Sequence, residues 1–230
     1  MASQLVSFIP IFSHQTAARN KPPTLYRCSQ NHGVSQTQLP KDKNAYKNIT
    51  IKTLDDSRMN IAQYGFLYNA RGGQGTGSLV KVKEDKFNRN APLRFEFDLR
   101  TVHIPSMTSN TAKFIGQFPP MFRVDVVSEN IKADIYVESG KVELKYRAKL
   151  WVSIGSGYKA PPLTVDMIFT TEELKAALSK GAKGTRLDNN GKCRLVGVTR
   201  IDPTDDSFLN SVLGLPSDCI TSMNLIISFF

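Results

Sequence analysis

Hydrophobic and polar residues alternate most regularly between Lys141 and Phe169. Apolar side chains occupy every second position in the first half of this stretch: Val142, Leu144, Tyr146, Ala148, Leu150, Val152 and Ile154. The positions between them are polar apart from Trp151. Because successive side chains of a β-strand point to opposite faces of a sheet, this pattern predicts a strand with one buried and one solvent-facing side. A second alternating run begins at Leu163, after a Gly- and Pro-rich turn, and predicts an antiparallel partner.

Shorter alternating segments predict further strands, and without the three-residue run 185–187 the total is eight or nine. They cover residues 48–52, 62–69, 79–83, 93–104, 122–137, 185–187, 194–201 and 219–229. The alternation changes phase at Glu129 and Asn130, which predicts a β-bulge. Asn190 and Gly191 lie between two such runs, and both residue types tolerate positive φ, so we expect a tight hairpin there.

Helical signals are confined to two short segments. A capping box that begins at Thr170 precedes a predicted helix over residues 174–178, and a second predicted helix over residues 208–213 is capped by Asp206 or Ser207. Strands without alternating helices predict a mainly β fold, a single antiparallel β-barrel-like domain with two short helices. A β-sandwich is the alternative. The barrel is favoured because a closed sheet has no exposed edge.

The most glycine-rich stretch runs from Arg71 to Gly77. Its four glycines lack the spacing of a phosphate-binding loop, and a strand pattern follows where such a loop would open a helix. We therefore predict a flexible hairpin tip, with a mobile lid over a ligand entrance as the alternative.

The first forty-one residues contain no Asp or Glu, four basic residues and eight Ser or Thr, a composition typical of an organelle transit peptide. The opening Met-Ala-Ser and the step Tyr-Arg-Cys-Ser at residues 26–29 resemble a plant chloroplast transit peptide and its processing site. The resemblance implies import into the chloroplast, to the stroma or the stromal side of a plastid membrane. Mitochondrial import and secretion fit less well, since arginines are few and Pro10 interrupts the apolar segment.

Three regions follow from this composition. Residues 1–28 form the predicted plastid transit peptide, residues 29–47 are polar and are predicted to be a disordered leader, and residues 48–230 form the barrel domain. No apolar stretch is long enough for a membrane-spanning helix, so we predict no transmembrane segment.

The formal net charge of +10 falls to +7 without residues 1–28, because 27 basic and 20 acidic residues remain. A basic protein attracts nucleic acid, anionic lipid surfaces or acidic proteins, although lysines spread along strands also serve solubility alone. The residues predicted to form a basic surface are Lys81, Lys83, Lys145, Arg147 and Lys149. Together with Trp151 and Tyr158 they allow stromal RNA binding as one alternative function, although nucleic acid is the less favoured partner.

Side chains suited to catalysis are scarce in the predicted domain. His103 is its one histidine, and the spacing of Cys28, Cys193 and Cys219 fits no metal site, so we expect no metal, no cofactor and no catalytic residue. Cys193 and Cys219 are predicted to be buried thiols, with a disulfide as the alternative. An isomerase or cyclase that needs little more than a shaped cavity stays open, with His103, Asp98 and Tyr146 as the residues to examine.

A barrel with an aromatic inner face and little catalytic equipment predicts a non-enzymatic plastid protein that binds an apolar or amphipathic molecule, such as a lipid, pigment or isoprenoid, or sits on a membrane surface. The predicted ligand-binding residues are Phe95, Phe97, His103, Tyr146 and Trp151. In general shape this barrel is similar to lipocalins and plastid-lipid-associated (fibrillin) proteins, although the lipocalin Gly-x-Trp signature is missing. An assembly factor for a photosynthetic or other plastid complex is the main alternative.

Overall fold

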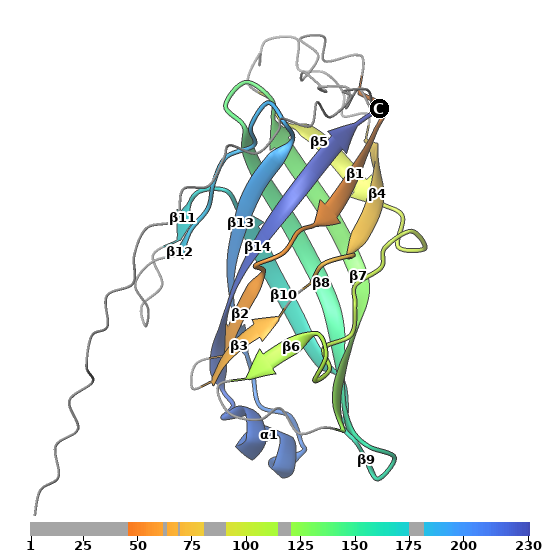
Figure 1. Ribbon diagram of the computed structural model, residues 1–230, viewed down its shortest axis with the longest axis vertical. Coiled ribbons are helices and arrows are strands. Elements are labelled where there is room, and N and C mark those ends of the chain that lie inside the picture. The colour runs from red at the N-terminus through yellow and green to blue at the C-terminus, as the bar shows by residue number, and fades with distance from the viewer. Residues whose placement is uncertain (1–45, 62–63, 69, 81–90, 115–120, 175–181) are drawn as a thin grey trace, which may run out of the picture. The chain divides into compact units, whose positions relative to one another are not determined.

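An antiparallel sheet that closes into a ring forms the core of the protein (Figure 1). The computed structural model describes residues 46–61, 64–68, 70–80, 91–114, 121–174 and 182–230. Around the ring the strands follow the order β1 (Asn48–Thr53), β4 (Gln74–Leu79), β5 (Leu93–Phe97), β7 (Phe122–Tyr136), β8 (Lys141–Ile154), β10 (Leu163–Thr170), β13 (Lys192–Ile201) and β14 (Ser217–Phe229). Because β14 also pairs with β1, the eight strands close on themselves. The predicted mainly β, barrel-like fold is confirmed.

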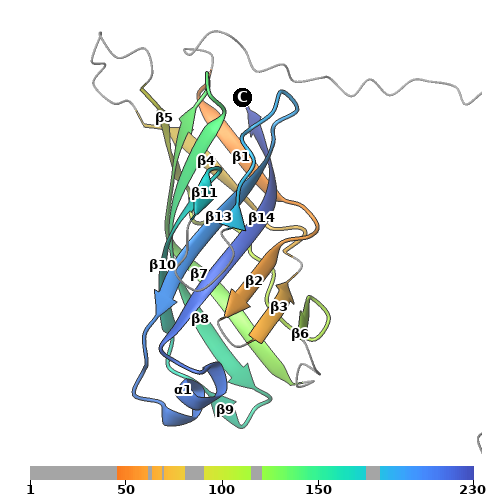
Figure 2. The same cartoon turned by 90° about the vertical axis from the view of Figure 1, so that its left-hand side faces the viewer.

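The ring is not a perfect barrel, because it divides beside β14. The last residues of β14 pair with β1, whereas Cys219 to Ser222 pair with β2 (Arg58–Ile61), which continues through β3 (Tyr64–Tyr68) to β6 (Ala112–Phe114). Asn224 holds the bend between the two branches: its carbonyl accepts the Leu54 N–H at 2.8 Å and its side-chain amide donates to the Asp55 carbonyl at 3.1 Å. Figure 2 shows the smaller branch beside the main ring.

Residues 102–107 cross the space between the two branches. At one end His103 pairs with Gln74 at the start of β4, and at the other end Met107 pairs with Val124 of β7. The Tyr68 hydroxyl, at the end of β3, donates to the Pro105 carbonyl between these two bridges. The segment therefore bridges β4 and β7 of the ring, and the Tyr68 hydrogen bond holds it to the smaller branch.

The alternation predicted for the two central strands is confirmed. In β8 the side chains of Val142, Leu144 and Ala148 are buried, whereas Lys145 and Arg147 are exposed. β10 pairs with β8 along its whole length, in antiparallel register. The predicted bulge is confirmed as well. It is a register shift between Ser128 and Asn130, where β7 pairs with β8.

Two clusters of buried side chains fill the ends of the barrel. The upper core cluster lies where β5 and β7 meet the C-terminal strand and contains Tyr46, Ile49, Phe95, Ile135 and Val142. The lower core cluster lies at the end that carries the helix and contains Phe122, Val124, Val152, Leu163, Leu209 and Leu213. In the upper cluster the Tyr46 ring stacks against Phe229 with centroids 4.7 Å apart.

The predicted second helix is confirmed as α1 (Ser207–Leu213). One Asp206 carboxylate oxygen accepts the Leu209 N–H at 2.9 Å, and the other accepts the Tyr158 hydroxyl at 2.8 Å. Tyr158 belongs to β9 (Tyr158–Lys159), a short extension paired with β8, so the cap also fastens the helix to the barrel. No helix in the described ranges is long and apolar enough to cross a bilayer.

The predicted first helix is wrong where the structure describes it. Glu173 and Leu174 form β11 (Glu173–Leu174), which pairs with β12 (Ala182–Lys183), and residues 175–178 lie outside the described residues. The capping groups have other partners. The Thr170 hydroxyl accepts the Glu172 N–H at 3.2 Å, and Glu173 pairs with Lys183 in the β11–β12 ladder.

The prediction of a hairpin tip for the glycine-rich stretch is also wrong, since this stretch is mostly strand. β4 starts at Gln74, and Gly75 and Gly77 face the Phe97 ring across the β4–β5 pair. A Cβ atom at Gly77 would lie 3.1 Å from that ring. The glycines therefore give Phe97 room to lie against the inner face of β4. Of the strand predicted over residues 79–83, Leu79 ends β4, Val80 is outside it, and residues 81–83 lie outside the described part.

The strand predicted over residues 93–104 stops at Phe97. Asp98 starts a turn in which its carboxylate accepts the Arg100 N–H at 3.0 Å and its carbonyl accepts the Thr101 N–H at 2.9 Å. Asp side chains commonly stabilise turns in this way, by bonding to the backbone two residues ahead. The turn breaks the phase of the alternation, so the residues beyond it do not continue the inner face of β5.

Replacement of Gly191 by Ala tests the turn before β13. Gly191 has φ of 75°, and a Cβ atom there would collide with the Ile227 carbonyl oxygen. Together these effects should lower the free energy of unfolding by about 1–3 kcal/mol. Gly157→Ala is the control, since nothing lies within 4 Å of its Cβ position. Urea denaturation of both variants checks this, and equal loss of stability would contradict it.

Candidate functional site

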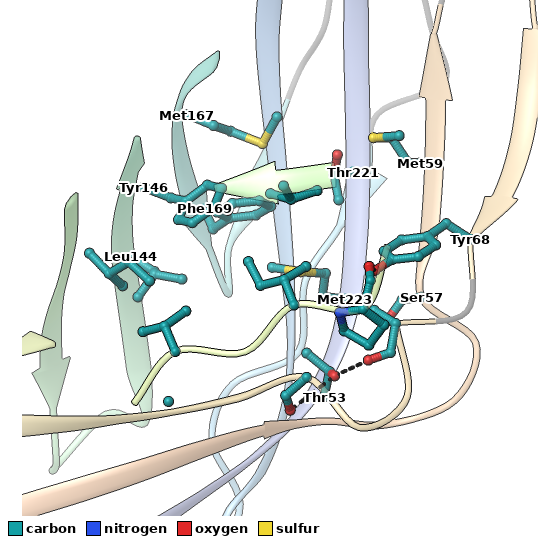
Figure 3. A pocket seen from close by; sticks show the side chains of 18 of the residues that line it. Thr53, Ser57, Met59, Tyr68, Leu144, Tyr146, Met167, Phe169, Thr221 and Met223 are labelled. Atoms are coloured by element: carbon teal, nitrogen blue, oxygen red, sulfur yellow. Dashed lines mark hydrogen bonds between the residues drawn. The ribbon is translucent and has the colours of Figure 1, made fainter. Parts of the chain in front are cut away.

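The barrel is hollow between its two core clusters. The cavity there has a volume of about 170 Å³ (Figure 3). None of the residues named above for the two ends of the core is among its lining residues, so the cavity lies between them.

The cavity wall is almost wholly apolar. Eleven of its lining residues lie on the inner faces of four ring strands: Val126, Ile131, Leu144, Tyr146, Leu150, Val165, Met167, Phe169, Thr221, Met223 and Leu225. The strands that carry them are β7, β8, β10 and β14. The crossing segment supplies Val102 and Pro105 on the opposite side. Such a wall excludes strongly hydrated molecules, since few of its groups can replace their hydrogen bonds to water.

Methionine is concentrated in this wall. The chain has six methionines, and four of them, Met59, Met107, Met167 and Met223, line the cavity. Figure 3 shows Met59, Met167 and Met223 arranged around it on different strands. Methionine side chains are flexible and polarisable, and they contact aromatic rings favourably. The wall can therefore adjust its shape around an unsaturated or aromatic molecule.

Two tyrosines provide the main polar groups. The Tyr146 hydroxyl lies 3.2 Å from the Ser128 hydroxyl, and burial raises the pKa of Tyr146 to about 12. Burial also raises the pKa of Tyr68, and the neighbouring Tyr146 raises it further. Both phenols are therefore neutral at physiological pH. Three smaller hydroxyl side chains also line the cavity: Thr53 and Ser57 donate to the Ala70 and Leu54 carbonyls, and the Thr221 hydroxyl lies 3.8 Å from the Cys219 sulfur.

Three lining residues have exposed side chains: Arg58, Gln74 and His103. All three lie where the ring divides, since Arg58 starts β2 and His103 pairs with Gln74 at the start of β4. Arg58 pairs with Ser222 of β14, whereas its neighbour Met59 pairs with the inward-facing Thr221. Strand alternation thus points Arg58 away from the interior. This side of the barrel is the candidate entrance to the cavity.

The predicted ligand-binding residues do not all reach the cavity. Phe97 and Tyr146 line it, and His103 borders it with an exposed side chain because the turn at Asp98 changes the phase of the alternation. Phe95 lies in the upper core cluster, fully buried, with its ring centroid 6.3 Å from that of Phe229. Ligand contact by these residues stays a prediction.

The fifth predicted ligand-binding residue, Trp151, lies on the outer face of β8 and is not a lining residue. The Lys159 ammonium group stacks over its ring, 5.4 Å from the centroid, which accounts for an aromatic side chain on the polar face. Alternation identifies the face of a strand residue correctly here, but the presence of an aromatic ring does not identify a ligand contact.

The predicted basic surface is partly neutralised. Arg147 and Lys149 both pair with Glu129, at 3.8 and 2.7 Å, while Lys145 is exposed on the same strand. Lys81 and Lys83 lie outside the described residues. Exposed ion pairs of this kind contribute little stability and leave less charge for a polyanionic partner.

The cavity lacks the usual groups for acid–base or metal chemistry. Within the described ranges no cluster of three or more His, Cys, Asp or Glu side chains could hold a metal ion. Asp98 forms an ion pair with Arg100 on the exposed turn, 2.8 Å apart, and so does not face Tyr146. The arrangement is suited to binding a molecule and shielding it from water.

Sequence reasoning did not select several wall residues. Met167, Phe169, Thr221 and Met223 all lie on strand faces that alternation identified as apolar, but that pattern does not distinguish a wall from a filled core. Tyr68 was in a segment recognised only as aromatic. The one available signal was the concentration of methionine on inner faces.

Comparison of the chain with protein-family models, with curated proteins and with solved structures found no match. The function must therefore be inferred from the cavity itself.

The two barrel cysteines are free, buried thiols, as predicted. Burial raises the pKa of Cys193 to about 12 and that of Cys219 to about 11. At pH ~8 at most about one Cys219 in a thousand is then a thiolate, the form that reacts. With Cys28 replaced by Ser, we expect no rapid reaction of the native chain with a disulfide reagent and two reactive thiols after unfolding. A thiol that reacts within seconds in the native protein would contradict this.

Proposed function

We propose that the protein binds a small apolar molecule inside its barrel and acts as a non-enzymatic binding protein of plastids. The observation that carries the proposal is the cavity of about 170 Å³ between two well-packed core clusters. The plastid location rests on the composition of the first forty-one residues.

The energetic cost of the cavity supports a functional role. Empty volume in a core costs roughly 24 cal/mol per Å³, or about 4 kcal/mol for a void of this size. That is a large part of the roughly 5–15 kcal/mol by which domains are stable. Protein interiors are otherwise packed as densely as organic crystals. A bound molecule would recover much of this cost, because it replaces the missing contacts.

The apolar wall supports a ligand and not a water cluster. Ordered waters in a cavity need two to four polar partners each, and apolar cavities of similar size stay dry yet accept molecules such as benzene. Here the Tyr68 hydroxyl donates to the Pro105 carbonyl, and the Tyr146–Ser128 pair has one hydrogen left to donate, fewer than the two to four partners that a water needs. The interior therefore offers little to water and much to an apolar molecule.

The structure offers less support for the alternative functions. An assembly factor or an RNA-binding protein would use the basic surface, in which Arg147 and Lys149 share Glu129. An isomerase or cyclase would need a proton donor and acceptor facing the cavity, and Asp98 lies on the exposed turn.

Two neighbouring residues of β7 allow a matched test. Val126 lines the cavity, whereas Val127 is 50% exposed on the outer face. Val126→Phe should fill part of the cavity and weaken binding of benzene at least about tenfold, while Val127→Phe should leave it unchanged. Titration of the full chain followed by NMR measures both affinities, and circular dichroism checks the fold. Equal benzene affinity in the two variants would refute the cavity as the binding site.

A further inference from the structure

The cavity also restricts the class of its ligand, an inference that rests on the proposed function. We propose that the site takes an uncharged molecule about the size of a single six-membered ring, unsaturated or aromatic, with one oxygen that accepts a hydrogen bond from Tyr146.

Size gives the first restriction. The volume of about 170 Å³ is close to that of an engineered apolar cavity of roughly 150 Å³ that binds benzene. Pockets for drug-sized ligands occupy about 300–1,000 Å³. Fully buried side chains lie at both ends of the barrel, Phe95 and Ile135 above and Leu209 below, and none of the three lines the cavity. A long acyl chain or a carotenoid-sized pigment therefore does not fit between them.

Charge gives the second restriction. The inner wall carries hydroxyl groups but no inward-pointing charged side chain among the described lining residues. Arg58 and His103 are exposed at the candidate entrance, and the strand register turns Arg58 outward. An anion moved inside would lose its hydration without gaining a counter-charge, which is strongly unfavourable. The ligand that fits the interior is neutral.

Hydrogen bonding gives the third restriction. The hydroxyls of Tyr146 and Ser128 carry two hydrogens between them, and their mutual bond at 3.2 Å uses one. When Ser128 donates, the Tyr146 hydrogen is free to bond a ligand oxygen. The Tyr68 hydrogen, in contrast, is already donated to the Pro105 carbonyl. Thr53 and Ser57 also donate to backbone carbonyls, so Tyr146 is the phenol whose hydrogen is available to a ligand.

The surrounding side chains favour a π-system. Tyr146 and Phe169 lie with ring centroids 6.2 Å apart and tilted by 55°, and Met167 and Met223 lie in the same wall. Figure 3 shows the two rings side by side, with methionine sulfurs around the cavity. Aromatic edges and thioether sulfurs contact an unsaturated ring more favourably than a saturated chain.

Benzene, phenol and benzoate form a matched set, since they share one ring and differ in oxygen and charge. We expect the full chain at neutral pH to bind phenol about fivefold more tightly than benzene, the value of one hydrogen bond of about 1 kcal/mol, and benzoate at least about tenfold more weakly than phenol. Titration followed by NMR gives the three affinities.

Tyr146→Phe separates the hydrogen bond from the shape of the site. The variant should reduce phenol affinity about fivefold, to the level of benzene, while benzene binding stays unchanged and so proves that the cavity is intact. Tyr136→Phe is the control, because the Tyr136 ring packs near the Lys141 ammonium group at the end of β7, away from the cavity. Equal loss of benzene and phenol affinity would overturn the role of Tyr146.

Two further outcomes separate this inference from the proposed function. Tight benzoate binding that is lost in Arg58→Ala would overturn the neutral-ligand inference in favour of an anion held at the entrance. Failure of all three probes, while organic solvent releases a larger molecule from the natively purified protein, would likewise overturn the inference but leave the proposed function standing. If no probe binds and organic solvent releases no molecule, both the neutral-ligand inference and the proposed function are refuted.

Discussion

The pairing of β14 with three other strands is the constraint on which the structure depends. One edge of β14 pairs with β13, and the other edge is shared between β1 and β2. The β1 pairing closes the main ring, and the β2 pairing starts the smaller branch. Asn224 stabilises the point of division, because its amide oxygen accepts a hydrogen bond from Arg194 while its amide nitrogen donates to Asp55.

The cavity follows from the same geometry. A ring of eight strands is just wide enough for inward side chains to fill it or to leave room for one small ligand. Large side chains such as Phe95 and Phe122 lie at the two ends, and in the middle the inner side chains leave a space of about 170 Å³ between them. Gly197 adds to this, since Met167 and Phe169 pack over it and a Cβ atom there would lie 2.6 Å from the Met167 sulfur. The hollow middle is thus a property of residue size on inner faces.

Much of the fold could be predicted from local patterns. The alternation in β8 and β10 predicted which side chains are buried and that the two strands pair. Asp206 and the residues after it predicted α1. Errors arose where a side chain had a tertiary partner instead of a local one. Glu173 and Leu174, at the end of the expected capping box, pair with Lys183 and Ala182 of β12 and do not start a helix. Gly75 and Gly77 make room for Phe97 and do not form a flexible tip.

The candidate site was predictable only in part. Tyr146 and Phe97 lie on faces that alternation identified, but His103 depends on the turn at Asp98, and Trp151 on an outward contact with Lys159. Whether opposite walls meet or leave a cavity depends on ring closure and on side-chain size across the barrel. No single stretch of sequence contains that information.

The central claim is that the barrel interior holds a small molecule. Native mass spectrometry of the protein purified without organic solvent, repeated after solvent extraction, tests it most directly. We expect the native mass to exceed that of the polypeptide by the mass of one small neutral molecule, and we expect this difference to disappear on extraction. A mass equal to that of the polypeptide alone, in protein taken from its natural source, would contradict it.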